Sequence, residues 1–309
     1  MLDGDIVLWQ STFTCLLQVT LGPDGRLKDV RPIDRGRGIY FGLTRAGDRV
    51  FVAARNTGPD GQTVDPARPT NTVVEFPTGR SWALHGTRGA HQIRWRDGLV
   101  WVMNCRAPEL VALDPTAGTV VGGVDLGALV PDHLRHPAPA EHLTDAYHFN
   151  SLDFAGDRLF VLAHNWGYGS FALELDAAEV LTRPRVRQVH TGLGTQAHDV
   201  FADGDRLHVL DSGGGRLIEC DGRGVIGRAA GMGFARGLAA NRDFFFIGHG
   251  TVGRREDRVT SPTYLSVVDR RTFAVVSRVE VGPYGNPCDL LLMSEPDWTD
   301  TGRPAREGR

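Results

Sequence analysis

The sequence predicts an all-β protein, a six-bladed β-propeller with four-stranded blades, and three observations lead to this prediction. A segment of two short apolar strands recurs six times along the 309 residues. The strands are joined by turns rich in Gly, Asp and Asn, which tolerate the positive φ that tight hairpin turns need. A second, more polar hairpin follows most copies. Each unit therefore holds four strands, which is typical of a propeller blade.

The six copies share a small or polar start, an apolar strand, a turn, a second apolar strand and a polar end. In chain order they are GIYFGLTRAGDRVFVAARN from Gly38, AHQIRWRDGLVWVMNC from Ala90, YHFNSLDFAGDRLFVLAHN from Tyr147, QAHDVFADGDRLHVLDSG from Gln196, FARGLAANRDFFFIGHG from Phe234 and NPCDLLLM from Asn286. The outer hairpins, such as YLSVVDRRTFAVVSRVEV from Tyr264, alternate apolar and polar residues. This alternation indicates strands with one solvent-exposed face.

The two ends of the chain are expected to complete one blade together. The sixth copy stops after a single strand, and the N-terminal stretch GDIVLWQSTFTCLLQVTL supplies strands with no inner strand before them. Pairing the two would close the ring and remove the open sheet edges that invite aggregation. A β-sandwich, or two smaller β domains, is the alternative. Six copies in phase, with no linker between them, favour a single propeller domain over residues 1–309.

Two segments interrupt the repeat. Residues 56–72 are rich in Gly, Pro, Asn and Asp and predict a long surface loop. Residues 126–146 enter a blade immediately before His148, and a loop of this length in a compact fold is often a lid or a binding loop. Residues 295–309 form a polar tail, which we expect to be frayed.

Composition excludes several functional classes. The net charge is −3, so the chain offers no strongly basic field for nucleic acid or an anionic membrane. No apolar run approaches the ~20 residues of a membrane helix. Asp3 and Asp5 stand where a signal peptide would carry basic residues, so we expect a cytoplasmic protein.

The four cysteines are expected to be reduced and packed. They are far apart in the sequence and none belongs to a CxxC pair, so a four-thiolate zinc site or a disulfide framework is not expected. They are Cys15, Cys105, Cys220 and Cys288.

Several segments resemble a bacterial family of uncharacterised propeller proteins, a conserved domain of unknown function. They are TDAYHFNSLDF, AHDVFADGDRLHVLDSGGGRLIECD, GFARGLAANRDFFFIGHG and YLSVVDRRTFAVV. The resemblance spans roughly Ala90 to Met293 and implies the fold and the position of the site, but no activity. The architecture is more distantly similar to the gluconolactonase and strictosidine-synthase propellers. Gluconolactonases hold a divalent metal with Glu, Asn and Asp, whereas His occupies the expected positions here, so neither calcium nor lactone hydrolysis carries over.

Polar residues are expected to converge at one end of the central channel. The start of each inner strand and the end of the next strand lie at the same face, because neighbouring strands are antiparallel. The candidate site residues at these positions are Tyr40, Arg55, His91, Asn104, His148, Asn150, His164, His198, Asp211, Arg236, His249 and Asn286.

Three histidines in this set predict a metal site. His91, His148 and His198 occupy the same register in three consecutive blades. Three convergent imidazoles suit a divalent ion with open positions for water or substrate, and they favour Zn, Fe or Mn over Ca. The alternative is structural, because a His at a blade start can simply bond the backbone of the neighbouring blade.

The remaining candidates receive roles by their chemistry. Arg55 and Arg236 suit a carboxylate or phosphate. The residues assigned to catalytic acid–base chemistry are His164, His249 and Asp211. Those assigned to substrate binding, besides the two arginines, are Tyr40, Asn104, Asn150 and Asn286.

The sequence therefore predicts a metal-dependent enzyme of the hydrolase, lyase or isomerase/cyclase type. It would act on a small polar or carboxylate-bearing molecule at the mouth of the channel. A non-catalytic propeller that binds a ligand or a protein is one alternative, since the fold alone decides no function. A non-haem iron enzyme with oxidative chemistry at the same histidines is another. The sequence does not predict the oligomeric state.

Overall fold

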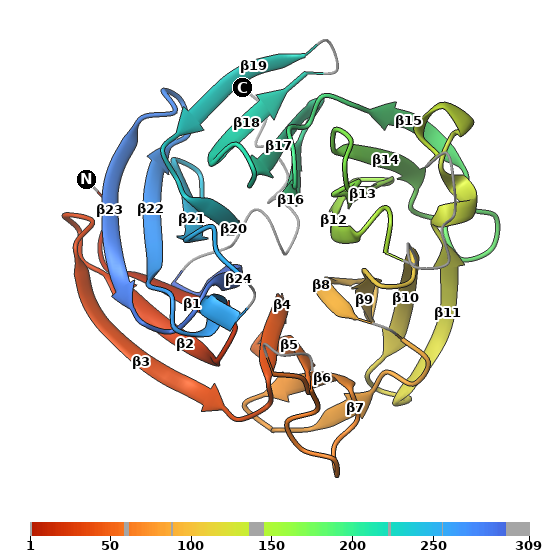
Figure 1. Ribbon diagram of the computed structural model, residues 1–309, viewed down its shortest axis with the longest axis horizontal. Helices are drawn as coiled ribbons and strands as arrows, with labels where there is room; N and C mark the ends of the chain where they lie inside the picture. Colours follow the sequence, from red (N-terminus) through yellow and green to blue (C-terminus); the bar gives the residue numbers. More distant parts are fainter. Residues whose placement is uncertain are drawn as a thin grey trace.

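Six antiparallel sheets surround a central axis in the computed structural model, which describes residues 2–58, 62–87, 89–135, 145–221, 224–254 and 256–294. Within these residues 24 strands are arranged as six four-stranded blades (Figure 1). This confirms the predicted six-bladed propeller. The innermost strands β4, β8, β12, β16, β20 and β24 line the channel.

The blades follow the chain, from the inner strand outward, except for the one that closes the ring. The first blade contains β4 (Ile39–Ala46), β5 (Arg49–Arg55), β6 (Asn71–Phe76) and β7 (Ser81–Ala83), and the second contains β8 (Ala90–Arg96), β9 (Leu99–Asn104), β10 (Glu109–Asp114) and β11 (Thr119–Asp125). The third contains β12 (Phe149–Ala155), β13 (Arg158–Ala163), β14 (Phe171–Asp176) and β15 (Val186–His190), and the fourth contains β16 (His198–Asp203), β17 (Arg206–Asp211), β18 (Arg216–Cys220) and β19 (Val225–Ala230). The fifth contains β20 (Phe234–Ala240), β21 (Phe244–Gly250), β22 (Thr263–Asp269) and β23 (Val275–Gly282). The closing blade contains β24 (Pro287–Leu292), β1 (Ile6–Thr12), β2 (Cys15–Leu21) and β3 (Leu27–Arg35). Short 3-10 helices span Gly127–Leu129, Asp132–Leu134 and Glu256–Val259.

Both chain ends contribute to the closing blade, as the sequence predicted. The order of strands in its sheet is β24-β1-β2-β3, so the last strand pairs with the first. The pairing is antiparallel, with Leu8 opposite Leu292 and Gln10 opposite Leu290. Figure 1 shows β24 beside β1 at the inner edge of this blade. The ring is therefore closed by hydrogen bonds between residues about 280 positions apart in sequence.

The hydrophobic core lies between the blades. The buried apolar residues form six clusters in the described part of the chain, and each joins two neighbouring blades. One of them joins Met103 of β9 to Phe171 of β14, and another joins Leu17 of β2 to Phe246 of β21. A blade thus buries its faces only against its neighbours, so stability depends on the complete ring.

A β-bulge interrupts the innermost strand of every blade near its start. The register skips between Tyr40 and Leu43 in β4, and it skips at the corresponding positions of the other five blades. Bulges bend a strand and redirect the side chains of the extra residues. Gly42 also lets β4 and β8 approach closely, since a Cβ there would lie 2.4 Å from the backbone nitrogen of Ile93. The bulges therefore shape the wall of the channel at one face.

The two long loops differ in how much of them is described. Asn56 organises the loop between β5 and β6, because its side chain bonds the backbone of Asp65 and Arg68 at 2.6 to 3.0 Å. In the segment 126–146, residues 136–144 lie outside the described residues, and so does the tail 295–309. The expectation of a lid at 126–146 therefore stays a prediction. No helix among the described residues has both the length and the apolar character to cross a membrane.

Closure of the ring can be tested at Leu291 in β24. Its side chain is fully buried between the closing blade and the blade of β4. Leu291→Ala is expected to lower the free energy of unfolding by about 2–5 kcal/mol, because it removes apolar contacts and leaves a cavity. Val276→Ala, at a position 54% exposed, is the control and should change stability by less than about 0.5 kcal/mol. Denaturant unfolding measures both, and a small effect at Leu291 would contradict a closure that depends on β24.

His208 lies in the interface between two blades, away from the channel. Its ring stacks on Phe201, with centroids 5.4 Å apart, and contacts Phe245 at 4.9 Å. Burial lowers the pKa of His208 to about 3. The folded protein therefore keeps this imidazole neutral, whereas the unfolded chain takes up a proton below its ordinary value of 6.5.

Acid is consequently expected to destabilise the fold through His208 between about pH 6.5 and pH 3. Stability falls as pH falls, because the unfolded state binds the extra proton, by about 1.4 kcal/mol per pH unit. This amounts to about 2 kcal/mol at pH 5. His208→Phe should lose less stability than the wild type between pH 7 and pH 5, as measured by urea unfolding at each pH. Equal losses in both proteins would contradict the neutral buried imidazole.

Candidate functional site at one end of the central channel

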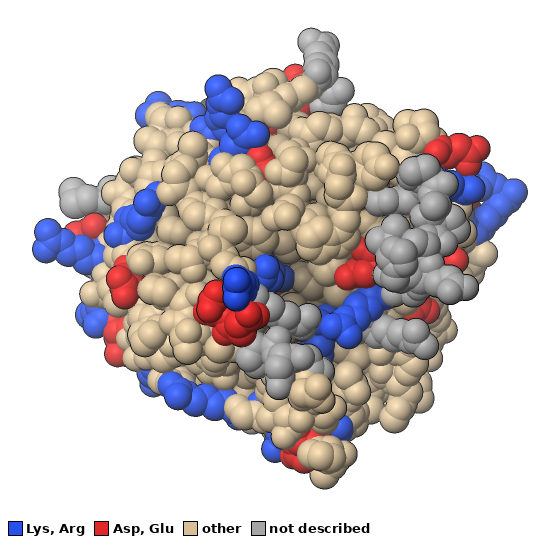
Figure 2. Space-filling model, in the orientation of Figure 1, with Lys and Arg blue, Asp and Glu red and all other residues tan. Residues whose placement is uncertain are grey.

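A cavity of about 340 Å³ lies at the end of the channel where the inner strands begin. Figure 2 shows a hollow near the centre of this view of the molecule, with basic and acidic side chains beside it. The residues that line the cavity come from all six blades and the segments joining them. They are Phe13, Ile39, Phe41, Arg55, His91, Cys105, Arg106, Asp145, His148, His164, Trp166, Gln196, His198, Phe234, Arg236 and Arg258.

The three histidines in common register meet at this cavity. One ring nitrogen each of His91, His148 and His198 lies within 4.8 Å of the nitrogens of the other two. Their positions follow from the strand starts. His91 lies in the bulge of β8, His198 is the first residue of β16, and His148 precedes β12 with a φ of +46°. The bulges and this unusual backbone conformation direct the rings to a common point.

Two of these imidazoles have one ring nitrogen fixed and the other directed to the cavity. Nδ1 of His148 lies 2.8 Å from a carboxylate oxygen of Asp145. Nδ1 of His198 lies 2.9 Å from both the carbonyl of Gln196 and the hydroxyl of Ser212. A proton on Nδ1 leaves the lone pair on Nε2 available, as in metal-binding histidines held by a carboxylate or carbonyl.

His91 is held differently. Nη2 of Arg236 donates a hydrogen bond to its Nε2 at 2.8 Å, and its other bond is to the backbone of Asn150. The imidazole must therefore be neutral, since a guanidinium donates to a lone pair. Burial, together with the charge of Arg236, lowers the pKa of His91 well below its ordinary value. The same two causes lower the pKa of His198.

His164, at the end of β13, is buried without a hydrogen-bond partner at either ring nitrogen. Only 3% of its surface is exposed. Its ring stacks on Trp166, with centroids 4.1 Å apart, and contacts His148 and His198 at 5.3 and 5.7 Å. Burial lowers the pKa of His164 to about 3. A buried imidazole that forms no hydrogen bond with a described residue is the kind of group that a ligand satisfies.

Two buried guanidinium groups supply positive charge without a carboxylate partner. Arg55 and Arg236 are 5% and 4% exposed, and neither forms a salt bridge with a described residue. Arg55 donates to the carbonyl of Ala90 and to the thiol of Cys105, and Nε of both arginines is unsatisfied. An unpaired buried charge is costly, so these groups call for an anion or solvent in the cavity.

The cavity has a second group of metal-ligand type and an aromatic wall. Cys105, Asp145 and His148 also bring ligand atoms within 4.8 Å of one another. Burial raises the pKa of the Cys105 thiol. Trp166, 44% exposed, lines the opening. Sequence reasoning did not single out Cys105 or Asp145 as site residues. The sequence signal that could have identified Asp145 is its position three residues before His148.

Several predicted site residues do not line this cavity. Asp211 pairs with Arg216 and accepts the backbone N–H of Thr195, and so stabilises a turn. His249 bonds Ser266 and stacks on Tyr264. These placements correct the expectation that Asp211 and His249 face the reacting molecule. The reason is that both lie in the second strand of a hairpin and meet partners within their own blade.

The predicted polar ligands of substrate are also corrected. Each side chain forms a hydrogen bond within the fold, and none is among the residues lining the cavity, while Oδ1 of Asn286 is buried without a partner among the described residues. Tyr40 bonds Asp34, Asn104 bonds Glu109, Asn150 bonds the carbonyl of Ala197, and Asn286 bonds the carbonyl of Thr251.

A buried polar layer ties the inner strands together beyond the histidines. Gln92 donates to Asp199 at 2.7 Å and accepts the N–H of Leu152 at 2.8 Å. Asp199 also accepts the N–H of Gly237 at 2.9 Å. These bonds connect the inner strands of four blades, β8, β12, β16 and β20. Burial raises the pKa of Asp199 to about 6. The histidines therefore rest on strands whose spacing is fixed.

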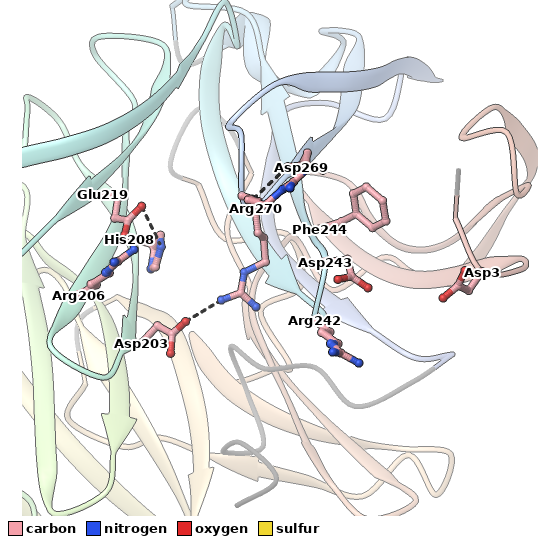
Figure 3. A pocket seen from close by; sticks show the side chains of 11 residues that line it. Asp3, Asp203, Arg206, His208, Glu219, Arg242, Asp243, Phe244, Asp269 and Arg270 are labelled. Carbon is pink, nitrogen blue, oxygen red and sulfur yellow. Dashed lines mark hydrogen bonds and ion pairs between the residues drawn. The ribbon is translucent and has the colours of Figure 1, made fainter. Parts of the chain in front are cut away.

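A larger cavity, about 610 Å³, is less suited to be the site. It lies beside the turn ends of the hairpins in the blades of β16 and β20 (Figure 3). Four of its charged groups are paired, since Arg270 bonds Asp203 at 2.8 Å and Arg206 bonds Glu219 at 2.6 Å. Charges paired in this way leave less need for a ligand than the unpaired guanidinium groups of the channel mouth.

Comparisons with known proteins support the fold and identify no function. No model of a protein family matches the chain, and no curated protein matches it. Among solved structures, it is similar to one of a nidogen/laminin complex, with a TM-score of 0.60, 10% identity, and 93% and 97% of the two chains covered. A protein of unknown function from Bacteroides caccae has a TM-score of 0.59, with 13% identity and coverage of 94% and 99%. A periplasmic gluconolactonase from Pseudomonas aeruginosa has a TM-score of 0.53, with 16% identity and coverage of 95% and 100%.

These likenesses agree with the resemblance drawn from the sequence. An uncharacterised bacterial protein and a gluconolactonase share the fold of this chain. At such low identity they show the fold alone, and the fold serves an enzyme and a laminin-binding complex alike. The class defined here is therefore a six-bladed β-propeller with a histidine- and arginine-lined cavity at one end of its channel.

Proposed function

We propose that the protein is a metal-dependent enzyme that acts on a small carboxylate-bearing molecule at the mouth of the channel. The reaction would be of the hydrolase, lyase or isomerase type. One observation carries this proposal. Three imidazoles and two buried guanidinium groups that form no salt bridge with a described residue share a single cavity of about 340 Å³. This is a volume for a small molecule, with few and convergent polar groups.

The donor set fits a transition-metal ion. His91, His148 and His198 would hold it, and imidazole ligands favour Zn, Fe or Mn over Ca. The carboxylate of Asp145 on Nδ1 of His148 supports this role, because such a contact orients the ring and raises its basicity. A bound ion of this kind would lower the pKa of a water molecule or polarise a carbonyl.

The chain's own residues would bind and position the substrate. Arg55 and Arg236 would donate hydrogen bonds to its carboxylate, since an Arg fork suits planar oxyanions. His164, with both ring nitrogens free of partners, is the side chain placed to accept or donate a proton in the cavity. Trp166 and Phe41 would cover the apolar part of the molecule and exclude water.

A metal-free protein that binds a small anion is the second candidate. The hydrogen bond from Arg236 to Nε2 of His91 favours it, because it occupies one of the three nitrogens that a metal ion would need. In that case the guanidinium groups alone would define the ligand, and no turnover would follow.

Metal content separates the two candidates. Protein purified without a His tag from cells supplied with Zn, Fe and Mn is expected to retain about one equivalent of metal, measured by elemental analysis. His91→Ala and His148→Ala should each lose it, since three-ligand sites rarely tolerate removal of a ligand. His208→Phe, which removes a buried histidine elsewhere, is the matched control and should retain the metal. Wild-type protein without metal, and insensitive to chelator, would favour the anion-binding candidate.

Anion recognition is tested by calorimetry with malonate on chelator-treated protein. Malonate should bind, and its uncharged analogue malonamide should not, because the guanidinium groups lack a counter-charge. Arg55→Met is expected to weaken malonate binding at least about tenfold, equivalent to about 1.4 kcal/mol. Arg96→Met, at the opposite end of β8, serves as the control and should leave binding unchanged. Equal binding of malonate and malonamide would contradict the proposed role of the arginines.

A further inference from the structure

The hydrogen bond between Arg236 and His91 competes with the binding of a metal ion to the His91 imidazole. Nη2 of Arg236 donates to Nε2 of His91 at 2.8 Å, and the remaining ring contact is with the backbone of Asn150. A lone pair on an imidazole nitrogen accepts either an N–H or a metal ion, but not both. In addition, a guanidinium at this distance repels a divalent cation. A metal ion can use all three histidines only after Arg236 leaves His91.

The same guanidinium is poised to bind an oxyanion. Nε of Arg236 is buried without a partner, and no salt bridge links this arginine to a described residue. Nε and Nη2 lie on one edge of the guanidinium, which is the edge that binds carboxylates and related anions through two parallel bonds. An oxyanion there competes with His91 for Nη2. It also neutralises the charge that opposes a metal ion.

We propose that Arg236 couples the binding of an anionic substrate to the completion of the metal site, an inference that rests on the proposed function. An oxyanion on Arg236 frees Nε2 of His91 and strengthens metal binding. By thermodynamic linkage the metal ion strengthens anion binding by the same factor. Without the anion, the open cavity holds the ion weakly, so the reactive centre forms only around its own substrate class, a small oxyanion.

Arg55 provides a matched control within the same cavity. It is buried to the same degree as Arg236 and carries the same charge. Both guanidinium groups lie over the ring of Phe41, at 4.4 and 6.0 Å from its centroid. Arg55, however, donates to the carbonyl of Ala90 and to Cys105, whereas Arg236 donates to His91. Removing either arginine removes one positive charge from the cavity, whereas only Arg236 contacts His91, so the response to sulfate isolates that contact.

The test titrates Co²⁺ into metal-free wild-type protein, Arg236→Met and Arg55→Met, and follows the visible absorption of the bound ion. Arg236→Met should bind Co²⁺ at least about fivefold more tightly than Arg55→Met, the lower end of usual coupling strengths. Sulfate, compared with chloride at equal ionic strength, should tighten Co²⁺ binding to the wild type and leave Arg236→Met unchanged. If Arg236→Met does not fold, Arg236→Gln and Arg55→Gln replace the pair, because Gln keeps a hydrogen-bonding group at the buried position.

The outcomes separate this inference from the proposed function. If both variants bind Co²⁺ equally, or sulfate acts equally on wild type and Arg236→Met, the coupling is overturned while the metal site stands. If none of the proteins binds Co²⁺, the metal site itself is overturned and the coupling with it. Tighter binding in Arg236→Met, together with loss of the sulfate effect, supports the coupling.

Discussion

Closure of the ring is the constraint from which the rest of the structure follows. Each blade buries its apolar faces only against two neighbours, so the chain must return β24 to β1 to leave no face exposed. Closure in turn brings six inner strands around one axis. Residues at equivalent positions of different blades then meet, although they are about 50 residues apart in sequence. The bulge at the start of each inner strand directs these residues into the mouth of the channel.

The site is defined by an imbalance of charge. Burial lowers the pKa of His91 and of His198, while Arg55 and Arg236 lie buried in the same cavity without a salt bridge to a described residue. A protein that stabilised only its own fold would gain little from two unpaired buried cations. A bound anionic ligand would neutralise the two guanidinium groups and so offset the free-energy cost of burying them. The hydrogen bond from Arg236 to His91 places one of these two guanidinium groups in direct contact with a proposed metal ligand.

The fold was predictable because repetition is visible in a single sequence. The hairpin copies gave the number of blades, and the unpaired strands at the two ends gave the mode of closure. The convergence of His91, His148 and His198 also followed from their common register, and the structure brings their ring nitrogens together.

Side-chain partners were harder to predict than backbone positions. Strand register placed Asp211 and His249 at the correct face, but it could not reveal that Arg216 and Ser266 hold them within their own blades. Asp145 was missed because it precedes its strand in an irregular segment. The contact between Arg236 and His91, 145 residues apart, depends on rotamers that no periodicity encodes.

The most direct measurement is the anomalous diffraction of crystals grown with Co²⁺ and sulfate. We expect an anomalous peak about 2.0–2.1 Å from Nε2 of His91, His148 and His198, the usual length of a bond from such a metal to a histidine nitrogen. We also expect sulfate on Arg236, with that side chain withdrawn from His91. A cavity without a metal peak at any Co²⁺ concentration, and with Arg236 still bonded to His91, would contradict this expectation.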